Sequence, residues 1–228
     1  MKQSLLIALA FALSHYCYAQ KIPKFGSDLG MKTVLGKELR PPYSEVKSYY
    51  GYIVSGAQAD EEKGGKKYYY VYVWIPVAAP EIGIRMISPV PDKMKPETGD
   101  FINEQYTRNE ADNQSYFDTW VTLERAVNIL SLTDVKAKIK SANWVQLGYN
   151  DDSNELPEQP SGLKYNSVLR VTSSLSDPLK AITVGLYRIG FTTFKTGTVQ
   201  GGFVAQIGAP IKLPGVIVAG NIDGLIAN

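Results

Sequence analysis

The stretch Lys66-Lys67-Tyr68-Tyr69-Tyr70-Val71-Tyr72-Val73-Trp74-Ile75-Pro76-Val77 decides the fold class. Aromatic and β-branched residues dominate it, which is typical of a β-strand. Side chains alternate along a strand, so its residues divide into two faces. One face carries Tyr69, Val71, Val73 and Ile75, and the other Tyr68, Tyr70, Tyr72 and Trp74. We expect both faces to be largely buried, between two sheets or beneath a helix. A tyrosine ladder of this kind also suits recognition of sugars or extended peptides.

Strand patterns of the same kind recur along the chain and predict at least seven strands. The clearest hairpin joins Thr183–Phe194 to Thr198–Gly208 through Lys195-Thr196-Gly197. Few helices are expected, chiefly a short one over Asp134–Ser141 and a helical turn within the polar excursion Asp92–Ser115. The pattern predicts a mostly β protein, an antiparallel β-sandwich or jelly roll with a few peripheral helices. The other expected strands are Lys47–Ser55, Ile82–Ser88, Tyr116–Ala126, Trp144–Gly148 and Lys164–Ser173.

The N-terminal residues predict export and divide the chain into three parts. Residues 1–19 contain Lys2, an apolar run from Leu5 to Leu13 and a small exit residue at Ala19, which is typical of a signal peptide. Cys17 is either the acylated first residue of a lipoprotein or is removed with a signal cleaved after Ala19. Residues 20–44, rich in Lys, Gly and Pro, are expected to form an extended lead-in rather than a core element. Residues 45–228 are expected to form a single sandwich domain.

Composition excludes several function classes. The chain has one His and one Cys, His15 and Cys17, so removal of residues 1–19 leaves neither and excludes His or Cys catalysis, His or Cys zinc sites and disulfides. Twenty-four Lys and Arg nearly balance 22 Asp and Glu, and no basic stripe predicts nucleic-acid binding. No second long apolar run predicts a membrane span, so a membrane is expected as a partner only through a lipid anchor.

Carboxylates give little reason to expect an enzyme. Asp118 and Glu124 share one face of the predicted strand Tyr116–Ala126. Six residues at strand rise separate them by roughly 20 Å, well beyond the distance that paired carboxylates of a glycosidase require. We therefore expect no catalytic residues.

An acidic loop concentrates oxygen donors. Asn150-Asp151-Asp152-Ser153-Asn154-Glu155 contains three carboxylates and no basic residue. Calcium takes six to eight oxygen ligands from carboxylates, amides and backbone carbonyls. Taken alone, the run is also compatible with a solvated loop.

The chain resembles the major outer-membrane surface lipoprotein family of Leptospira and its homologues, in order and over about Tyr49 to Val216. The matching segments are Tyr49-Tyr50-Gly51-Tyr52, Tyr69-Tyr70, Tyr72-Val73-Trp74-Ile75-Pro76, Arg85-Met86-Ile87-Ser88-Pro89, Phe117-Asp118-Thr119-Trp120, Glu124-Arg125, Lys164-Tyr165-Asn166-Ser167, Gly185-Leu186-Tyr187-Arg188 and Phe203-Val204-Ala205. The resemblance implies a jelly-roll sandwich, a surface location, a bound Ca²⁺ and adhesion to extracellular-matrix proteins.

The resemblance also implies which residues bind the ion. The family's ligands correspond to Asp118, Thr119, Asp151, Asp152 and Tyr165. If the strand is regular, Thr119 faces away from Asp118 and contributes its backbone carbonyl, or the strand bulges there. This chain keeps only two adjacent aspartates where the best-known members have a longer run.

These observations predict a non-enzymatic, calcium-binding envelope protein that binds extracellular-matrix or other surface proteins. Its location is either lipid-anchored at the outer membrane and cell surface or free in the periplasm or medium. Two alternatives stay open: a glycan-binding module that uses Tyr68, Tyr70, Tyr72 and Trp74, and a structural envelope protein in which calcium only stabilises the fold. A homodimer also stays open.

Overall fold

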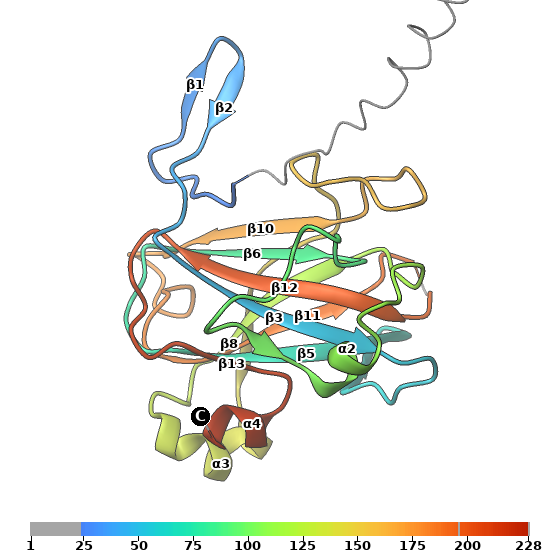
Figure 1. Ribbon diagram of the computed structural model, residues 1–228. Helices are drawn as coiled ribbons and strands as arrows, with labels where there is room; N and C mark the ends of the chain where they lie inside the picture. Colours follow the sequence, from blue (N-terminus) through green and yellow to red (C-terminus); the bar gives the residue numbers. More distant parts are fainter. Residues whose placement is uncertain (1–23, 196, 228) are drawn as a thin grey trace, which may run out of the picture.

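Two β-sheets packed face to face form the body of the protein (Figure 1). The structure, a computed structural model, describes residues 24–195 and 197–227. The predicted signal peptide and Cys17 therefore lie outside the described residues. One sheet has the strand order β10-β6-β12-β3-β7 and the other β13-β5-β11-β8-β9, with β4 paired to β5. All these pairs are antiparallel except β3 with β7. The prediction of a mostly β, antiparallel protein with few helices is confirmed.

The elements follow one another in this order along the chain. The strands are β1 (Lys32–Val34), β2 (Lys37–Leu39), β3 (Glu45–Ile53), β4 (Glu61–Lys63), β5 (Lys66–Ile75), β6 (Glu81–Ile87), β7 (Phe101–Ile102), β8 (Trp120–Ala126), β9 (Trp144–Asn150), β10 (Ser167–Thr172), β11 (Gly185–Thr192), β12 (Gly201–Ala209) and β13 (Ile217–Ala219). The helices are α2 (Glu104–Arg108), α3 (Val135–Lys138) and α4 (Ile222–Ala227), with short 3₁₀ turns at Leu132–Asp134 and Ile139–Ser141. None of the helices in the described ranges is long and apolar enough to cross a bilayer.

The core lies between the two sheets. The β5 face predicted from Tyr69, Val71, Val73 and Ile75 is buried in it, with the inward residues of β6, β8, β11 and β12. An aromatic cluster bridges the sheets: the ring centroids of Phe191 on β11 and Phe203 on β12 lie 4.7 Å apart, and Phe117 contacts both. A second apolar cluster joins α3 and α4 to the outer face of β5 through Val135, Leu225 and Trp74. Figure 1 shows these two helices below the β5 sheet.

The predicted hairpin between Thr183–Phe194 and Thr198–Gly208 is wrong. Its arms are β11 and β12, and they belong to opposite sheets: β11 pairs with β5 and β8, and β12 with β3 and β6. The connection therefore crosses the sandwich. Both arms carry large inward aromatic residues, and facing each other across the core buries Phe191 against Phe203 more completely than pairing edge to edge would.

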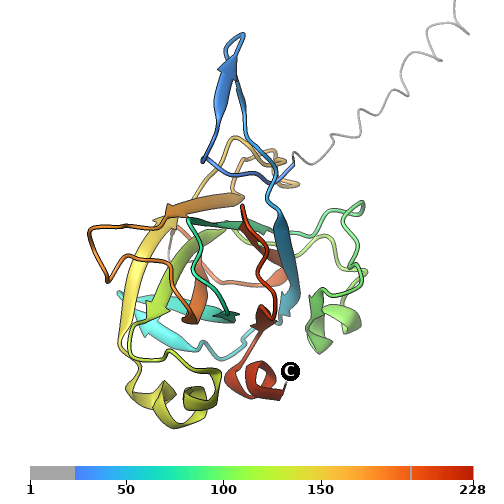
Figure 2. The same cartoon turned by 90° about the vertical axis from the view of Figure 1, so that its left-hand side faces the viewer.

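The described part of the expected lead-in, residues 24–44, includes two residues of a core cluster. Phe25 and Tyr43 are buried on the outer face of β6 and β12, so this segment contributes to a core cluster. The Tyr43 ring packs where Gly83 and Gly208 have no side chain; a Cβ on either glycine would lie within 2.5 Å of a ring carbon. The lysine- and proline-rich composition of the segment conceals these two aromatic residues. Between them, β1 and β2 form a hairpin that projects from the body (Figure 2).

Candidate functional site

Strand pairing brings the predicted oxygen ligands together at one edge of a sheet. Asp118 and Thr119 directly precede β8, and Asp151 and Asp152 directly follow β9. Because β8 and β9 are antiparallel, with Val121 opposite Asn150, the start of one strand lies beside the end of the other. The strand predicted over Tyr116–Ala126 begins only at Trp120.

Hydrogen bonds connect three of these loops through backbone carbonyls. The Thr119 backbone N–H and hydroxyl both donate to the Tyr165 carbonyl, at 2.9 and 3.0 Å. The Ser167 hydroxyl lies 2.6 Å from the Thr119 carbonyl and also reaches the Asp151 carbonyl and the Thr119 hydroxyl. The hydroxyl groups of Thr119 and Ser167 can donate only two hydrogen bonds to these three carbonyls. Because each carbonyl oxygen can accept two bonds, the three oxygens can still accept further ones.

The Thr119 side chain is used in hydrogen bonds within the protein. It is buried and engaged with Tyr165 and Ser167, which leaves its carbonyl as the oxygen it can offer to a cation. The register shift between β8 and β9 occurs between Leu123 and Glu124, so it does not reorient Thr119.

The Asp118 carboxylate lies in a position that is unfavourable for its negative charge. Its Oδ1 atom is buried and has no hydrogen-bond partner among the described residues. Burial raises the pKa of Asp118 to about 6, and the charges of Asp152 and Asp151 act in the same direction. Burial, followed by the charge of Asp151, also raises the pKa of Asp152. The three carboxylates are thus close enough to repel one another.

The donor set suits a hard cation only with help from the backbone. In the ranges 24–195 and 197–227, no three His, Cys, Asp or Glu side chains are grouped closely enough to hold a metal ion by themselves. A cation here would need carbonyl oxygens beside the carboxylates, a mixture that calcium accepts. A buried carboxylate oxygen without a donor, with two more carboxylates nearby, fits that requirement.

Two buried amides fix the acidic loop against the sandwich. The Gln159 amide donates to the carbonyls of Ser88 and Phe117, at 2.8 and 2.6 Å. Asn166 accepts from the Ser88 N–H at 2.9 Å and donates to the Pro157 carbonyl at 2.7 Å. The segment after Asp152 is therefore held beside the segment that leads into Asp118.

The predicted aromatic face of β5 is not an open platform. Tyr70 and Trp74 are buried, while Tyr68 and Tyr72 are half-buried. The rings of Tyr70 and Tyr72 are inclined by 51°, and the Arg188 guanidinium covers Tyr70 at 3.8 Å from its ring centroid. Sugars stack on aromatic rings that are exposed and coplanar, and these four residues do not provide such a platform.

A different set of aromatic residues is exposed beside the carboxylates. Tyr149 is 63% exposed and Phe194 is 51% exposed. Their ring centroids lie 6.2 and 5.9 Å from that of half-buried Trp120. Lys66 caps Trp120 with its Nζ atom 3.6 Å from the ring centroid and donates to the Phe194 carbonyl at 2.6 Å. We call Trp120, Tyr149, Phe194 and Lys66 the aromatic patch.

Sequence reasoning missed this aromatic patch, although one signal was present. The alternation of Tyr116–Ala126 assigned Trp120 to the same face as Asp118. The aromatic patch adjoins the carboxylates because Trp120 is two residues from Asp118, and Tyr149 is two residues from Asp151.

Glu124 is engaged in an ion pair. It is buried, and the Arg188 Nε atom donates to it at 2.6 Å. Glu61 also contacts Arg188, at 3.3 Å, and accepts from the Tyr70 hydroxyl at 2.5 Å. The Glu124 carboxylate and its arginine thus neutralise each other on the outer face of the sheet.

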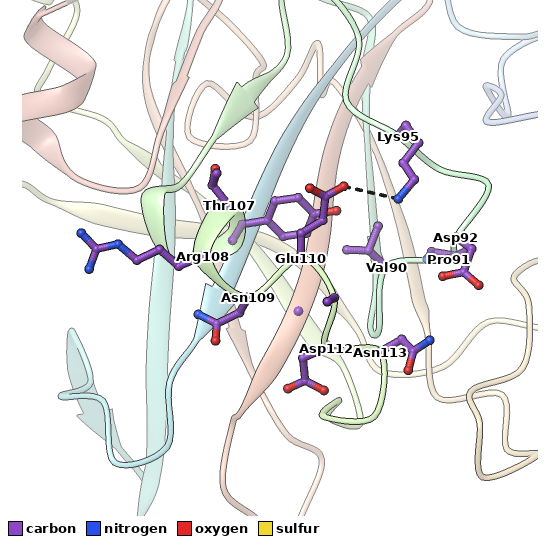
Figure 3. Close-up of a pocket in the computed structure, with 13 residues that line it drawn as sticks. Val90, Pro91, Asp92, Lys95, Thr107, Arg108, Asn109, Glu110, Asp112 and Asn113 are labelled. Atoms are coloured by element: carbon purple, nitrogen blue, oxygen red, sulfur yellow. Dashed lines mark hydrogen bonds and ion pairs between the residues drawn. The ribbon is translucent and has the colours of Figure 1, made fainter.

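A polar cleft of about 450 Å³ lies beside α2, away from the predicted ligands (Figure 3). Its walls come from the excursion after β6 and from the loop after α2. Lys95 and Glu110 approach each other across it at 3.3 Å, as Figure 3 shows. Asp112 in its lining accepts a 2.6 Å hydrogen bond from the Tyr52 hydroxyl.

The fold and the site define a class: a two-sheet β protein whose polar site offers carboxylate and carbonyl oxygens. Within that class, the chain belongs to the surface lipoprotein family of the Spirochaetales order (Lipl32), which it matches over residues 37–218. The match runs from β2 into β13 and includes every predicted ligand. It confirms the sequence-based assignment to the Leptospira surface lipoprotein family. No curated protein matches the sequence.

Membership implies an exported protein of the cell surface. Cys17 lies before the matched range as well as outside the described residues.

Proposed function

We propose that this protein is a non-enzymatic, calcium-binding surface protein whose ion site organises an adjacent surface for a protein partner. The observation that carries the proposal is the buried Asp118 Oδ1 atom, which has no hydrogen-bond partner in the described chain and lies near Asp151 and Asp152. A divalent cation would supply the positive charge that these carboxylates lack.

The chain's own residues would hold the ion as follows. Asp118, Asp151 and Asp152 would offer carboxylate oxygens, and Thr119 and Tyr165 their carbonyls. The Tyr165 carbonyl currently accepts from the Thr119 hydroxyl, and that hydroxyl has a second acceptor in Ser167 at 2.7 Å. Thr119 can therefore release the Tyr165 carbonyl without leaving its own hydroxyl unsatisfied.

Strand order supports the finer assignment to a jelly roll. The eight long strands divide equally between the sheets, with β3, β6, β10 and β12 in one and β5, β8, β9 and β11 in the other, and the chain changes sheet at every step except from β8 to β9. The last two, β11 and β12, each insert between two earlier strands. This interleaving is typical of jelly rolls.

The aromatic patch supports partner binding. Trp and Tyr are among the residue types enriched at the binding hot spots of protein interfaces, and Phe is enriched in interface cores. Neutralising Asp118, Asp151 and Asp152 would reduce the motion of the acidic loop that follows Tyr149 at the end of β9, and so lower the ordering cost of binding.

The test is binding to immobilised fibronectin or collagen, with calcium and with chelator. The variant Tyr149→Ala/Phe194→Ala should lose at least about tenfold in affinity, the scale of a single interface hot spot. The control Leu130→Ala/Leu179→Ala removes two exposed apolar side chains from other loops and should bind as the wild type does. Chelator should weaken wild-type binding.

Unchanged binding in the aromatic variant and in chelator would reject the partner surface. Calcium-dependent stability without calcium-dependent binding would favour the structural alternative, in which the ion only stabilises the fold.

We further propose that Cys17 carries the lipid anchor, which family membership supports. Labelled palmitate should enter the wild-type chain and be absent from Cys17→Ser. Equal labelling of both, or none in the wild type, would contradict the anchor.

A further inference from the structure

The β1–β2 hairpin exposes an unusual amount of apolar surface. Leu35 at its tip is 99% exposed, and Leu39 and Val34 are 55% and 48% exposed. Leu29 and Met31 at the base are also exposed. Figures 1 and 2 show the hairpin standing away from both sheets, so the body of the protein does not cover it.

The hairpin has an apolar and basic face. Lys32 pairs with Leu39 and Val34 pairs with Lys37, which places these four side chains on one side of the ribbon. Thr33 and Glu38 occupy the other side. Alternating lysines and apolar residues suit a boundary where stems are buried and ammonium groups stay in water.

The geometry of the turn does not explain why a leucine stands at its tip. Leu35 has φ 50° and Gly36 has φ 74°, the left-handed conformations of a tight hairpin turn. Asn, Asp or Gly is favoured at both positions, because other side chains are strained there. The chain instead holds a large apolar side chain in that conformation, surrounded by solvent.

The base of the hairpin is fixed, so its direction is set by the body. Arg40 forms ion pairs with Asp28 at 2.6 Å and Glu38 at 2.8 Å. Arg170 on β10 donates to the Gly26 carbonyl at 2.7 Å. Phe25 and Tyr43, buried on either side of the hairpin in sequence, fasten both of its ends.

We propose that the β1–β2 hairpin is a membrane-contacting element that inserts Leu35 and Val34 into the headgroup region of a lipid bilayer. The inference rests on the proposed anchor at Cys17, since the anchor determines which end of the protein faces lipid. Lys24 follows Cys17 by seven positions in the sequence, a separation of at most about 25 Å. The hairpin base begins four residues after Lys24, at Asp28, so an acylated chain would hold the hairpin near the same bilayer.

Charge favours lipid over a second copy of the chain. Lys32 and Lys37 have no ion-pair partner among the residues described, and Lys21 and Lys24 precede the hairpin in sequence. Basic side chains around an apolar tip are attracted to anionic lipids. In a two-fold dimer through this face, the same lysines would oppose one another.

The test couples the chain from Cys17 onward to maleimide-bearing lipid in phosphatidylcholine–phosphatidylglycerol vesicles, with and without brominated acyl chains. Cys17 is the only cysteine, so coupling is specific and supplies the anchor chemically. A missing acylation of Cys17 in the cell therefore leaves this test unaffected. The variants are Leu35→Trp and the matched control Leu175→Trp, a fully exposed leucine in the loop between β10 and β11.

We expect brominated lipid to quench the added Leu35→Trp fluorescence at least twofold and to leave that of Leu175→Trp unchanged. The native tryptophans contribute the same background to both variants, and equal melting temperatures would verify their folding. Equal quenching, or none in either, would overturn the proposal. A second copy of the chain would be indicated instead if the Leu35→Trp emission shifted to the blue with rising protein concentration in the absence of vesicles, and if brominated lipid did not quench it. That result would overturn the proposal.

Discussion

Replacing Asp118 by Asn should stabilise the calcium-free protein while abolishing its response to calcium. Asp118 is held ionised at neutral pH although burial and the charges of Asp152 and Asp151 raise its pKa to about 6. An amide of the same shape removes that charge. The variant therefore shows whether Asp118 serves to bind a cation or to stabilise the fold.

The magnitude follows from the pKa. A rise from 3.8 to about 6 corresponds to ~3 kcal/mol at most. Because the carboxylate is partly exposed, solvent screening reduces this to ~1–2 kcal/mol. For a domain of this size that amounts to about 2–8 °C in melting temperature. In chelator at pH 7.5, Asp118→Asn should be more stable than the wild type by that amount.

The pH dependence has a definite sign. Between about pH 4 and pH 6, the folded protein keeps a proton on Asp118 that the unfolded chain has released. Wild-type stability in chelator should therefore fall across this window and level off above it, relative to Asp118→Asn. Saturating calcium should reverse the loss at pH 7.5, by about 2.7 kcal/mol at 100 times the dissociation constant.

The assay is thermal and urea unfolding in chelator and in calcium, from pH 4.5 to pH 7.5. Glu158→Gln is the matched control, because Glu158 is an exposed carboxylate in the loop between β9 and β10 that also carries Asp151 and Asp152. It should behave as the wild type in both conditions. A destabilised Asp118→Asn in chelator, or a calcium shift in it equal to that of the wild type, would refute the reasoning.

Three further substitutions test the packing around the site by urea unfolding. Gly83→Ala places a Cβ 2.3 Å from the Tyr43 hydroxyl and should lower the free energy of unfolding by about 2 kcal/mol, because the Tyr43 ring must move. An unchanged urea midpoint would argue against that packing. Glu124→Gln leaves the Arg188 guanidinium buried without its main carboxylate and should cost about 3 kcal/mol; a neutral effect would mean that Glu61 suffices. Arg170→Gln breaks a paired contact to Glu155 and should cost about 2 kcal/mol and speed proteolysis of residues 24–44; unaltered cleavage would contradict this fastening role.

Residue alternation made the strands predictable. Tyr69, Val71, Val73 and Ile75 occupy the interior face that their spacing indicates, because burial of apolar side chains acts locally on each strand. Strand pairing was not predictable in the same way. The Gly197 turn signal is local, whereas Phe191 and Phe203 meet across the sandwich, and only the complete set of strands decides that contact.

The candidate site was predictable in its chemistry but not in its surroundings. The adjacent Asp151 and Asp152, together with the family resemblance, identified an oxygen-rich loop. The exposure of Tyr149 and Phe194 depends on strand pairing, which places the ends of β9 and β11 on either side of the start of β8 and which sequence spacing does not encode. Conversely, Tyr70 and Trp74 looked suited to recognition, but Arg188 and α4 cover them.

Calorimetric titration of calcium into the chelator-treated protein tests the central claim most directly. The account predicts one ion bound per wild-type chain, and no measurable binding to Asp118→Asn or to Asp151→Ala/Asp152→Ala under the same conditions. Calcium that fails to bind the wild type, or that binds the variants with wild-type affinity, would contradict it.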